Sequence, residues 1–175
     1  PGPTALRFPR GTGPGAAVDT HPEAWPIGKA RWLKAHDDAR VSVLALGPTV
    51  ANAERAAERL AAEGIQVNVL DMRFIKPLDE ETIQTLAQDG EMGFVTLEEG
   101  VLAGGFGSAV LEYLSNEGFS NRVQRVGPPD EFIEHGSVAK QYAEAGLDVD
   151  GIVDTIRSLL PAPSRRRRAK DELAH

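Results

Sequence analysis

The stretch Phe94–Leu114 constrains the fold most, because it joins a strand pattern to a helix pattern through glycines. Residues 94–97 are apolar and β-branched, which predicts a buried strand. Glycines follow at positions 100, 104, 105 and 107. The helix pattern then begins at Ser108, a good N-cap, and places three apolar residues on one face, namely Val110, Leu111 and Leu114. A strand followed by acids, a glycine loop and a helix is typical of the functional edge of an open α/β sheet.

Two interpretations of the glycine loop are open. Gly104–Gly107 at a helix N-terminus has the composition of a phosphate cradle. However, the loop lacks the G-x-G-x-x-G spacing and has no Lys-Ser/Thr pair after it. Glu98 and Glu99 lie just before the loop and repel anions. We therefore favour close backbone packing, or docking of a partner, over phosphate binding.

Composition excludes several classes of protein. The 175 residues are 41% hydrophobic, enough for one ordinary core. A net charge of −7 argues against nucleic acid as the main partner. The chain has no cysteine, so disulfides, thiolate catalysis and cysteine metal sites are excluded. No membrane-spanning run or signal peptide is visible, and the chain starts at Pro1. We expect a soluble cytoplasmic piece of a longer protein with no membrane partner.

Periodicity along the rest of the chain predicts an α/β fold. The expected strands are 27–34 at an edge, then 41–46, 65–70, 94–97 and 122–127. The expected helices are 51–63, 80–87, 108–114, 137–145 and 149–160, with Thr49 and Asp79 as caps for the first two. Strand, helix and strand at this spacing predict a right-handed βαβ unit. The chain should form a three-layer domain with a mostly parallel sheet of about five strands and helices on both faces.

Polar residues at loop positions give no complete catalytic set. Asp71 and Arg73 follow a strand, where α/β proteins place functional side chains. One acid and one base define no reaction, so we favour a structural pair. His135 lies in an internal loop and has no acid and nucleophile beside it in the sequence. For His135 we favour a capping or packing role.

The two ends of the chain read as an arm and a tail. Residues 1–25 are rich in proline and glycine and contain the sequence Arg-Phe-Pro-Arg-Gly, which ends at Gly11. Arg10 on such a stiff tether is a good ligand for phosphate or carboxylate, because a guanidinium donates two parallel hydrogen bonds. Composition alone favours a solvated linker arginine. Residues 26–160 form the expected domain, and 161–175, with four arginines in a row, should be a disordered, solvated basic tail.

Several motifs together resemble the C-terminal domain of the transketolase family, and within that family the 1-deoxy-D-xylulose-5-phosphate synthases. They are Arg-Phe-Pro-Arg-Gly at 7–11, Pro-Ile-Gly-Lys at 26–29, Asp-Met-Arg-Phe-Ile-Lys-Pro-Leu-Asp at 71–79, Leu-Glu-Glu at 97–99 with Gly-Gly-Phe-Gly-Ser at 104–108, and Gly-Pro-Pro-Asp-Glu-Phe-Ile-Glu-His-Gly at 127–136. The resemblance runs from about Pro3 to Leu160. Single motifs are weak, but the combination is specific.

The resemblance implies a function for the complete enzyme. Members of that group join pyruvate and glyceraldehyde 3-phosphate and release carbon dioxide, with thiamine diphosphate supplying the carbanion chemistry and magnesium holding its diphosphate. The product feeds isoprenoid, thiamine and pyridoxal phosphate synthesis. Two upstream domains bind the cofactor, so the resemblance implies no catalytic, cofactor or metal residue in this chain. Arg10 matches the arginine that binds the phosphate of glyceraldehyde 3-phosphate.

The resemblance also implies partners and leaves alternatives. The domain should pack on the upstream domains and in a homodimer, and the isolated chain should be inactive. Phe8 stands where the family commonly has tyrosine, and the basic tail has no counterpart. One alternative is the C-terminal domain of a 2-oxo acid dehydrogenase β subunit, against which the arm argues because that enzyme holds no sugar phosphate. The other is a binding or regulatory module without catalysis.

Overall fold

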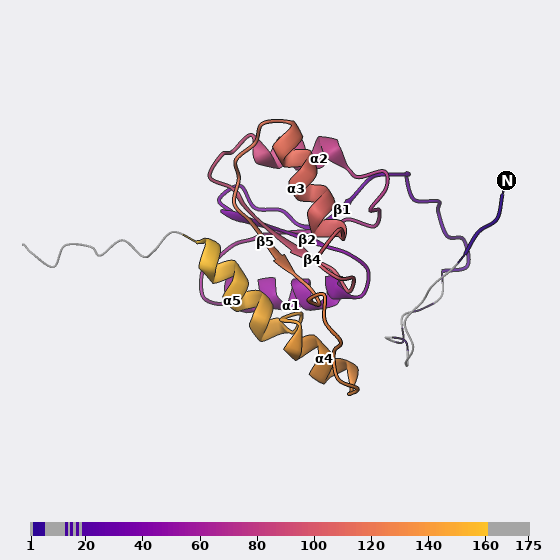
Figure 1. Ribbon diagram of the computed structural model, residues 1–175. Coiled ribbons are helices and arrows are strands. Elements are labelled where there is room, and N and C mark those ends of the chain that lie inside the picture. Colours follow the sequence, from indigo (N-terminus) through magenta and orange to yellow (C-terminus); the bar gives the residue numbers. More distant parts are fainter. Residues whose placement is uncertain (1, 6–12, 14, 16, 18, 161–175) are drawn as a thin grey trace, which may run out of the picture.

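The computed structural model describes residues 2–5, 13, 15, 17 and 19–160, which form a three-layer α/β domain (Figure 1). The strands are β1 Arg31–Lys34, β2 Val41–Ala45, β3 Asn68–Asp71, β4 Gly93–Leu97 and β5 Val123–Val126. The helices are α1 Thr49–Ala61, α2 Glu80–Ala87, α3 Phe106–Asn116, α4 Val138–Glu144 and α5 Val149–Leu159. The sheet order is β1-β3-β2-β4-β5, and only β1 runs antiparallel to its neighbour. The predicted fold class is confirmed.

The sheet separates two apolar cores. Helices α1 and α5 cover one face and α2 and α3 cover the other (Figure 1). Every residue of β2, β3 and β4 is buried, as expected for central strands with helices on both faces. Side chains alternate along each strand, so Val43 of β2 packs toward α1 and α5 while Leu44 packs toward α2 and α3.

The helix faces follow the predicted periodicity. Helix α1 buries Thr49 at its start and then a face of mostly small residues, Ala53, Ala56, Ala57 and Leu60. Helix α5 packs against it with a bulkier stripe of Ile152, Val153, Ile156 and Leu159. Alanine on one helix leaves room for branched side chains on the other, which gives close packing. On α3, Val110 and Leu114 are buried as predicted, whereas Leu111 is 37% exposed.

Strands β1 and β3 begin several residues later than the apolar pattern indicated. Residues 27–30 precede β1 because the chain turns there, with the Lys29 amide donating to the Pro26 carbonyl at 3.3 Å. Strand β3 begins only at Asn68, after the chain has left helix α1 through residues 62–67. In both places local turn geometry overrides an apolar sequence.

The predicted helix caps are partly right. The Asp79 side chain accepts from the Thr82 amide at 3.3 Å and caps α2, as predicted. Thr49 does not cap α1, because it is itself the first residue of that helix. Its hydroxyl donates instead to the Leu46 carbonyl at 3.0 Å, back toward the end of β2. Within the described residues, no helix is long and apolar enough to cross a membrane.

We predict that Leu60→Ala lowers the free energy of unfolding by about 2–5 kcal/mol, because the truncation leaves a cavity between α1 and the sheet. Leu60 is fully buried, whereas Leu111 lies largely outside the core. Leu111→Ala is therefore the matched control and should cost less than about 1 kcal/mol. Urea unfolding followed by circular dichroism measures both. Equal losses in the two variants would contradict this description of the core.

Candidate functional site at the carboxyl edge of the sheet

The carboxyl ends of the four parallel strands meet at one edge, which is where α/β folds bind ligands. The strand order reverses between β2 and β4, so the usual ligand position lies at the ends of these two strands. Here the Leu46 amide donates to the Leu97 carbonyl at 3.1 Å. Thr49 is fully buried and its hydroxyl lies 3.4 Å from the same carbonyl. Protein atoms therefore fill the reversal point.

A buried carboxylate closes the start of α3. Glu98, one residue after β4, is only 3% exposed. Its two oxygens accept from the amides of Phe106 at 2.7 Å and Gly107 at 2.8 Å. These are the first amides of α3, whose N-cap is Gly105 and not the predicted Ser108. A side chain from the preceding strand thus caps the helix and places a negative charge at its positive end.

The glycines of this loop allow that close contact. A Cβ on Gly105 would lie 2.1 Å from Glu98 Oε2 and 2.6 Å from the Val101 carbonyl. A Cβ on Gly107 would lie 2.5 Å from the Thr96 hydroxyl. Close backbone packing, the favoured prediction, is confirmed. The helix terminus is not a phosphate cradle, because the Glu98 carboxylate already occupies it.

Ser108, which does not cap the helix, fixes the loop instead. Its hydroxyl donates to the Leu102 carbonyl at 2.9 Å and accepts from the Gly104 amide at 3.1 Å. Arg125 of β5 donates to the same hydroxyl at 2.9 Å and to the Leu102 carbonyl at 2.8 Å. The hydroxyl uses its donor and both acceptor positions. These hydrogen bonds hold the loop that joins β4 to α3 against strand β5.

Asp71 and Arg73 form the structural pair that the sequence indicated. Arg73 has a φ of 58°, and the Asp71 carboxylate accepts from its amide at 3.2 Å. Arg31 of β1 donates to that carboxylate at 3.3 Å. The Arg73 guanidinium lies 4.4 Å from the centre of the Trp25 ring, a cation–π geometry. These contacts attach the base of the N-terminal arm to the end of β3.

Asp79 attaches the same segment a second time. Its carboxylate accepts from the Ala30 amide at 2.8 Å and from the Thr82 hydroxyl at 2.9 Å, and Lys29 lies 3.6 Å away. Burial opposes ionisation, but these bonds and the nearby lysine outweigh it and hold the pKa of Asp79 below its usual value. The stability from this carboxylate is therefore present above its unfolded pKa and is lost as pH falls through the lower folded pKa.

The loop after β5 and helix α4 attach to the domain through Tyr142. Its hydroxyl donates to Glu99 at 2.5 Å, and burial together with this bond raises the pKa of Tyr142. His135 in the same loop is exposed, and its ring bonds to no described residue. Within the described residues His135 therefore has no capping or packing partner.

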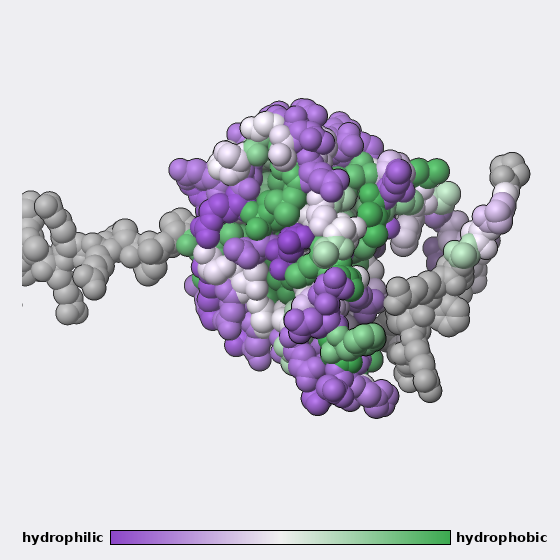
Figure 2. Space-filling view, viewed as in Figure 1, coloured by the Kyte–Doolittle hydropathy of each residue, from purple (hydrophilic) through white to green (hydrophobic). Residues whose placement is uncertain are grey.

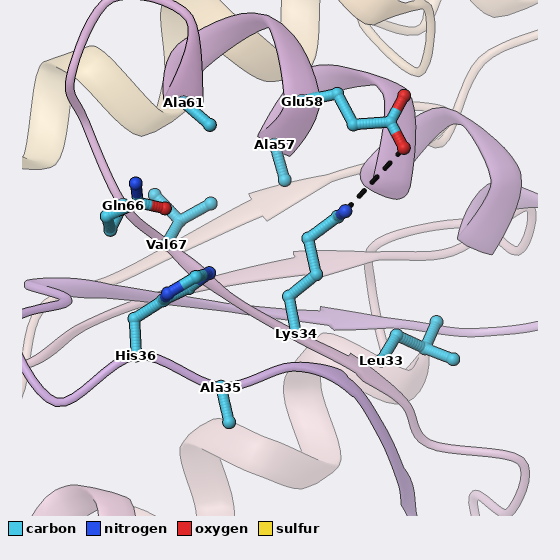
Figure 3. A pocket seen from close by; sticks show the side chains of 9 residues that line it. All are labelled: Leu33, Lys34, Ala35, His36, Ala57, Glu58, Ala61, Gln66 and Val67. Atoms are coloured by element: carbon cyan, nitrogen blue, oxygen red, sulfur yellow. Dashed lines mark ion pairs between the residues drawn. The ribbon is translucent and has the colours of Figure 1, made fainter.

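A separate pocket lies at the opposite edge, where β1 ends and β3 begins (Figure 3). Its volume is about 380 Å³, and its apolar wall comes from α1. Lys34 extends across it toward Glu58, with 3.6 Å between the ammonium and the carboxylate. The lysine charge is compensated, so the pocket offers no strong attraction for a phosphate.

The described residues do not fit thiamine diphosphate or magnesium. No three histidine, aspartate or glutamate residues gather in the described part of the chain. The one helix start with a glycine loop is filled by Glu98. Arg10 and its motif, and the arginine tail, lie outside the described residues.

Residues 28–152 match the family described as Transketolase, C-terminal domain. This chain belongs to the transketolase C-terminal domain family. Curated 1-deoxy-D-xylulose-5-phosphate synthases are similar to it: that of Acidobacterium capsulatum is 46% identical over 159 residues, and that of Desulforudis audaxviator is 47% identical over 175. These matches cover 91% and 99% of this chain but 25% and 26% of the relatives. The chain spans about a quarter of their length.

Solved structures agree with this assignment. A structure titled "Split gene transketolase, inactive beta4 tetramer" is 36% identical with a TM-score of 0.67, over 78% of this chain and 42% of that one. Transketolase from Campylobacter jejuni is 21% identical with a TM-score of 0.53, over 75% of this chain and 18% of that one, and supports the fold alone. The resemblance to transketolase C-terminal domains and to the synthases is confirmed.

Sequence reasoning missed the role of Glu98 in this domain. The sequence pattern places the two acids at the functional edge and indicates that they repel an anion, but it does not predict that one of them caps a helix. The available signal is the pair of glycines at the start of α3, since side chains there would occupy the space of a carboxylate coming from β4. Glu98 and Glu99 also have different roles, because one is buried at α3 and the other bonds to Tyr142.

We predict that Glu98→Gln lowers the free energy of unfolding by about 2 kcal/mol. The glutamine amide has one acceptor oxygen, so its NH₂ group faces one of the two helix amides that now donate. Glu112→Gln, on the exposed side of the same helix, is the control and should change stability by less than about 0.5 kcal/mol. Chemical denaturation measures the difference. A stability of Glu98→Gln equal to that of the control would show that the carboxylate is not the cap.

Proposed function

We propose that this chain is the C-terminal domain of a cytoplasmic 1-deoxy-D-xylulose-5-phosphate synthase. The complete enzyme joins pyruvate with glyceraldehyde 3-phosphate and releases carbon dioxide, and its product feeds isoprenoid, thiamine and pyridoxal phosphate synthesis. The observation that carries the proposal is the 47% identity to a named synthase over 99% of the chain, from the arm to the tail. Thiamine diphosphate supplies the carbanion chemistry when bound.

Arg10 is the residue of this chain that we assign to the substrate. Its guanidinium binds the phosphate of glyceraldehyde 3-phosphate through two parallel hydrogen bonds. The anchored root of the arm supports this assignment. Trp25 and Lys29 fasten the arm to Arg73 and Asp79 at the carboxyl edge, and the 14 residues between positions 10 and 25 span tens of ångströms when extended. The arm is long enough to reach a neighbouring domain.

The rest of the chain serves assembly. Residues 1–25 are the interdomain arm, 26–160 the folded domain and 161–175 a basic tail. Upstream domains hold the cofactor and magnesium, and two complete subunits form a homodimer. The resemblance assigns both groups to those upstream domains, so we expect the 175-residue chain alone to form no deoxyxylulose phosphate. Product formed from both substrates by this chain with thiamine diphosphate and magnesium would refute that assignment.

We predict that Arg10→Ala in the full-length enzyme raises the KM for glyceraldehyde 3-phosphate roughly thirtyfold, which corresponds to about 2 kcal/mol. The KM for pyruvate should stay nearly unchanged, because pyruvate carries no phosphate. Steady-state kinetics with each substrate varied in turn separates the two effects.

Two further variants serve as comparisons for Arg10→Ala. Arg10→Lys keeps the positive charge but loses the two parallel hydrogen bonds of the guanidinium. This variant should therefore recover only part of the affinity for glyceraldehyde 3-phosphate. Arg40→Ala removes a surface guanidinium that pairs with Glu91, and both KM values should stay unchanged. If both KM values also hold in Arg10→Ala, the arm is only a linker.

A further inference from the structure

Residues 129–144, which we name the α4 lobe, have no buried residue. The lobe follows β5 and contains α4, which stands at the end of α5 and away from the layers of the sheet (Figure 1). Phe132 is 107% exposed and Val138 is 57% exposed. A seven-residue helix is not stable in water by its own propensity and depends on packing. We propose that the α4 lobe is a docking element, covered by the part of a synthase polypeptide that precedes this chain.

Tyr142 joins the lobe to its own domain, and its ring packs against the core cluster of α1 and α5. Tyr142 bonds to Glu99, and Ser137 caps α4 by accepting from the Lys140 amide at 3.3 Å. Gln141 donates to the Glu134 carbonyl at 3.3 Å within the lobe. These bonds orient the lobe, but they bury neither Phe132 nor Val138. Figure 2 shows apolar surface among hydrophilic atoms in the region of α4.

The charge of the lobe indicates the chemistry of its partner surface. It contains four acids, Asp130, Glu131, Glu134 and Glu144, against one lysine, Lys140, so its net charge is −3 with histidine neutral. An interface of this kind has an apolar centre and a polar rim. The partner surface therefore presents an apolar pocket for Phe132, rimmed by arginine or lysine.

The position of the arm identifies the occupant. The chain spans about a quarter of the length of its relatives. The arm joins the domain at Trp25, beside Arg73 after β3, and the lobe begins after β5. Strands β3 and β5 run parallel, so both features lie at the carboxyl edge. Exposed Ile75 and Val101 lie in loops of the same edge. The root of the arm and the lobe therefore lie on the same edge of the sheet, which is the edge that we assign to the preceding polypeptide.

This inference rests on the proposed function, because it requires the upstream domains of a synthase. The test is hydrogen exchange by mass spectrometry on the full-length enzyme, for wild type, Phe132→Glu and the control Leu111→Glu. Phe132 makes no buried contact, so its substitution leaves the core amides unchanged. We expect amides 129–144 to be protected in wild type and in the control. Phe132→Glu should speed their exchange at least tenfold, because a docked aromatic anchor carries much of the binding energy.

The outcomes separate the two proposals. Unchanged exchange of the lobe in Phe132→Glu overturns the docking inference, whatever the activity of the enzyme. Protection that disappears on dilution overturns it as well, because a second copy would then be the occupant. A wild-type enzyme that forms no deoxyxylulose phosphate overturns the proposed function, and that result does not depend on the exchange data.

Discussion

The bond between Glu98 and the start of α3 determines the character of this domain. A carboxylate in the protein interior needs compensation, and two helix amides at 2.7 and 2.8 Å supply it. The contact requires glycine at 105 and 107, because side chains there would collide with Glu98 and Thr96. It also removes the anion site that an α/β fold usually offers at this edge. The domain thus satisfies its helix terminus internally.

Two other carboxylates at the same edge also bond to groups within the domain. Asp71 holds Arg31 and Arg73, and Asp79 holds Ala30 and Thr82. Each joins the segment that enters the domain to the loop after β3. The acids therefore serve as fasteners for the N-terminal connection, and their chemistry is already satisfied by internal partners. An arm attached in this way can carry Arg10 to a site outside the domain.

The sequence predicted the layers because burial periodicity is local. The short, mostly apolar run of β2 and the alanine face of α1 are each visible in a few neighbouring residues. Caps were harder to predict. Asp79 caps the helix that directly follows it, whereas α3 is capped by Glu98, eight residues before Phe106 and across a loop. The local pattern therefore predicts Ser108 as the cap. In the structure, the Ser108 hydroxyl instead accepts a hydrogen bond from Arg125 of the neighbouring strand β5. Arg10 lies outside the described residues, so its proposed role in binding phosphate rests on the resemblance alone.

At the carboxyl edge, buried polar groups bond to one another while several apolar side chains are exposed to water. The buried carboxylates Glu98, Asp71 and Asp79 are paired, yet Phe132, Ile75 and Val101 remain in water. A domain that worked alone would gain no folding stability from such residues, because an exposed phenylalanine buries no apolar surface. These three residues lie in loops at the carboxyl edge and fit the docking surface that we propose for the complete protein. In this proposal, the edge that binds ligands in other α/β folds serves for attachment.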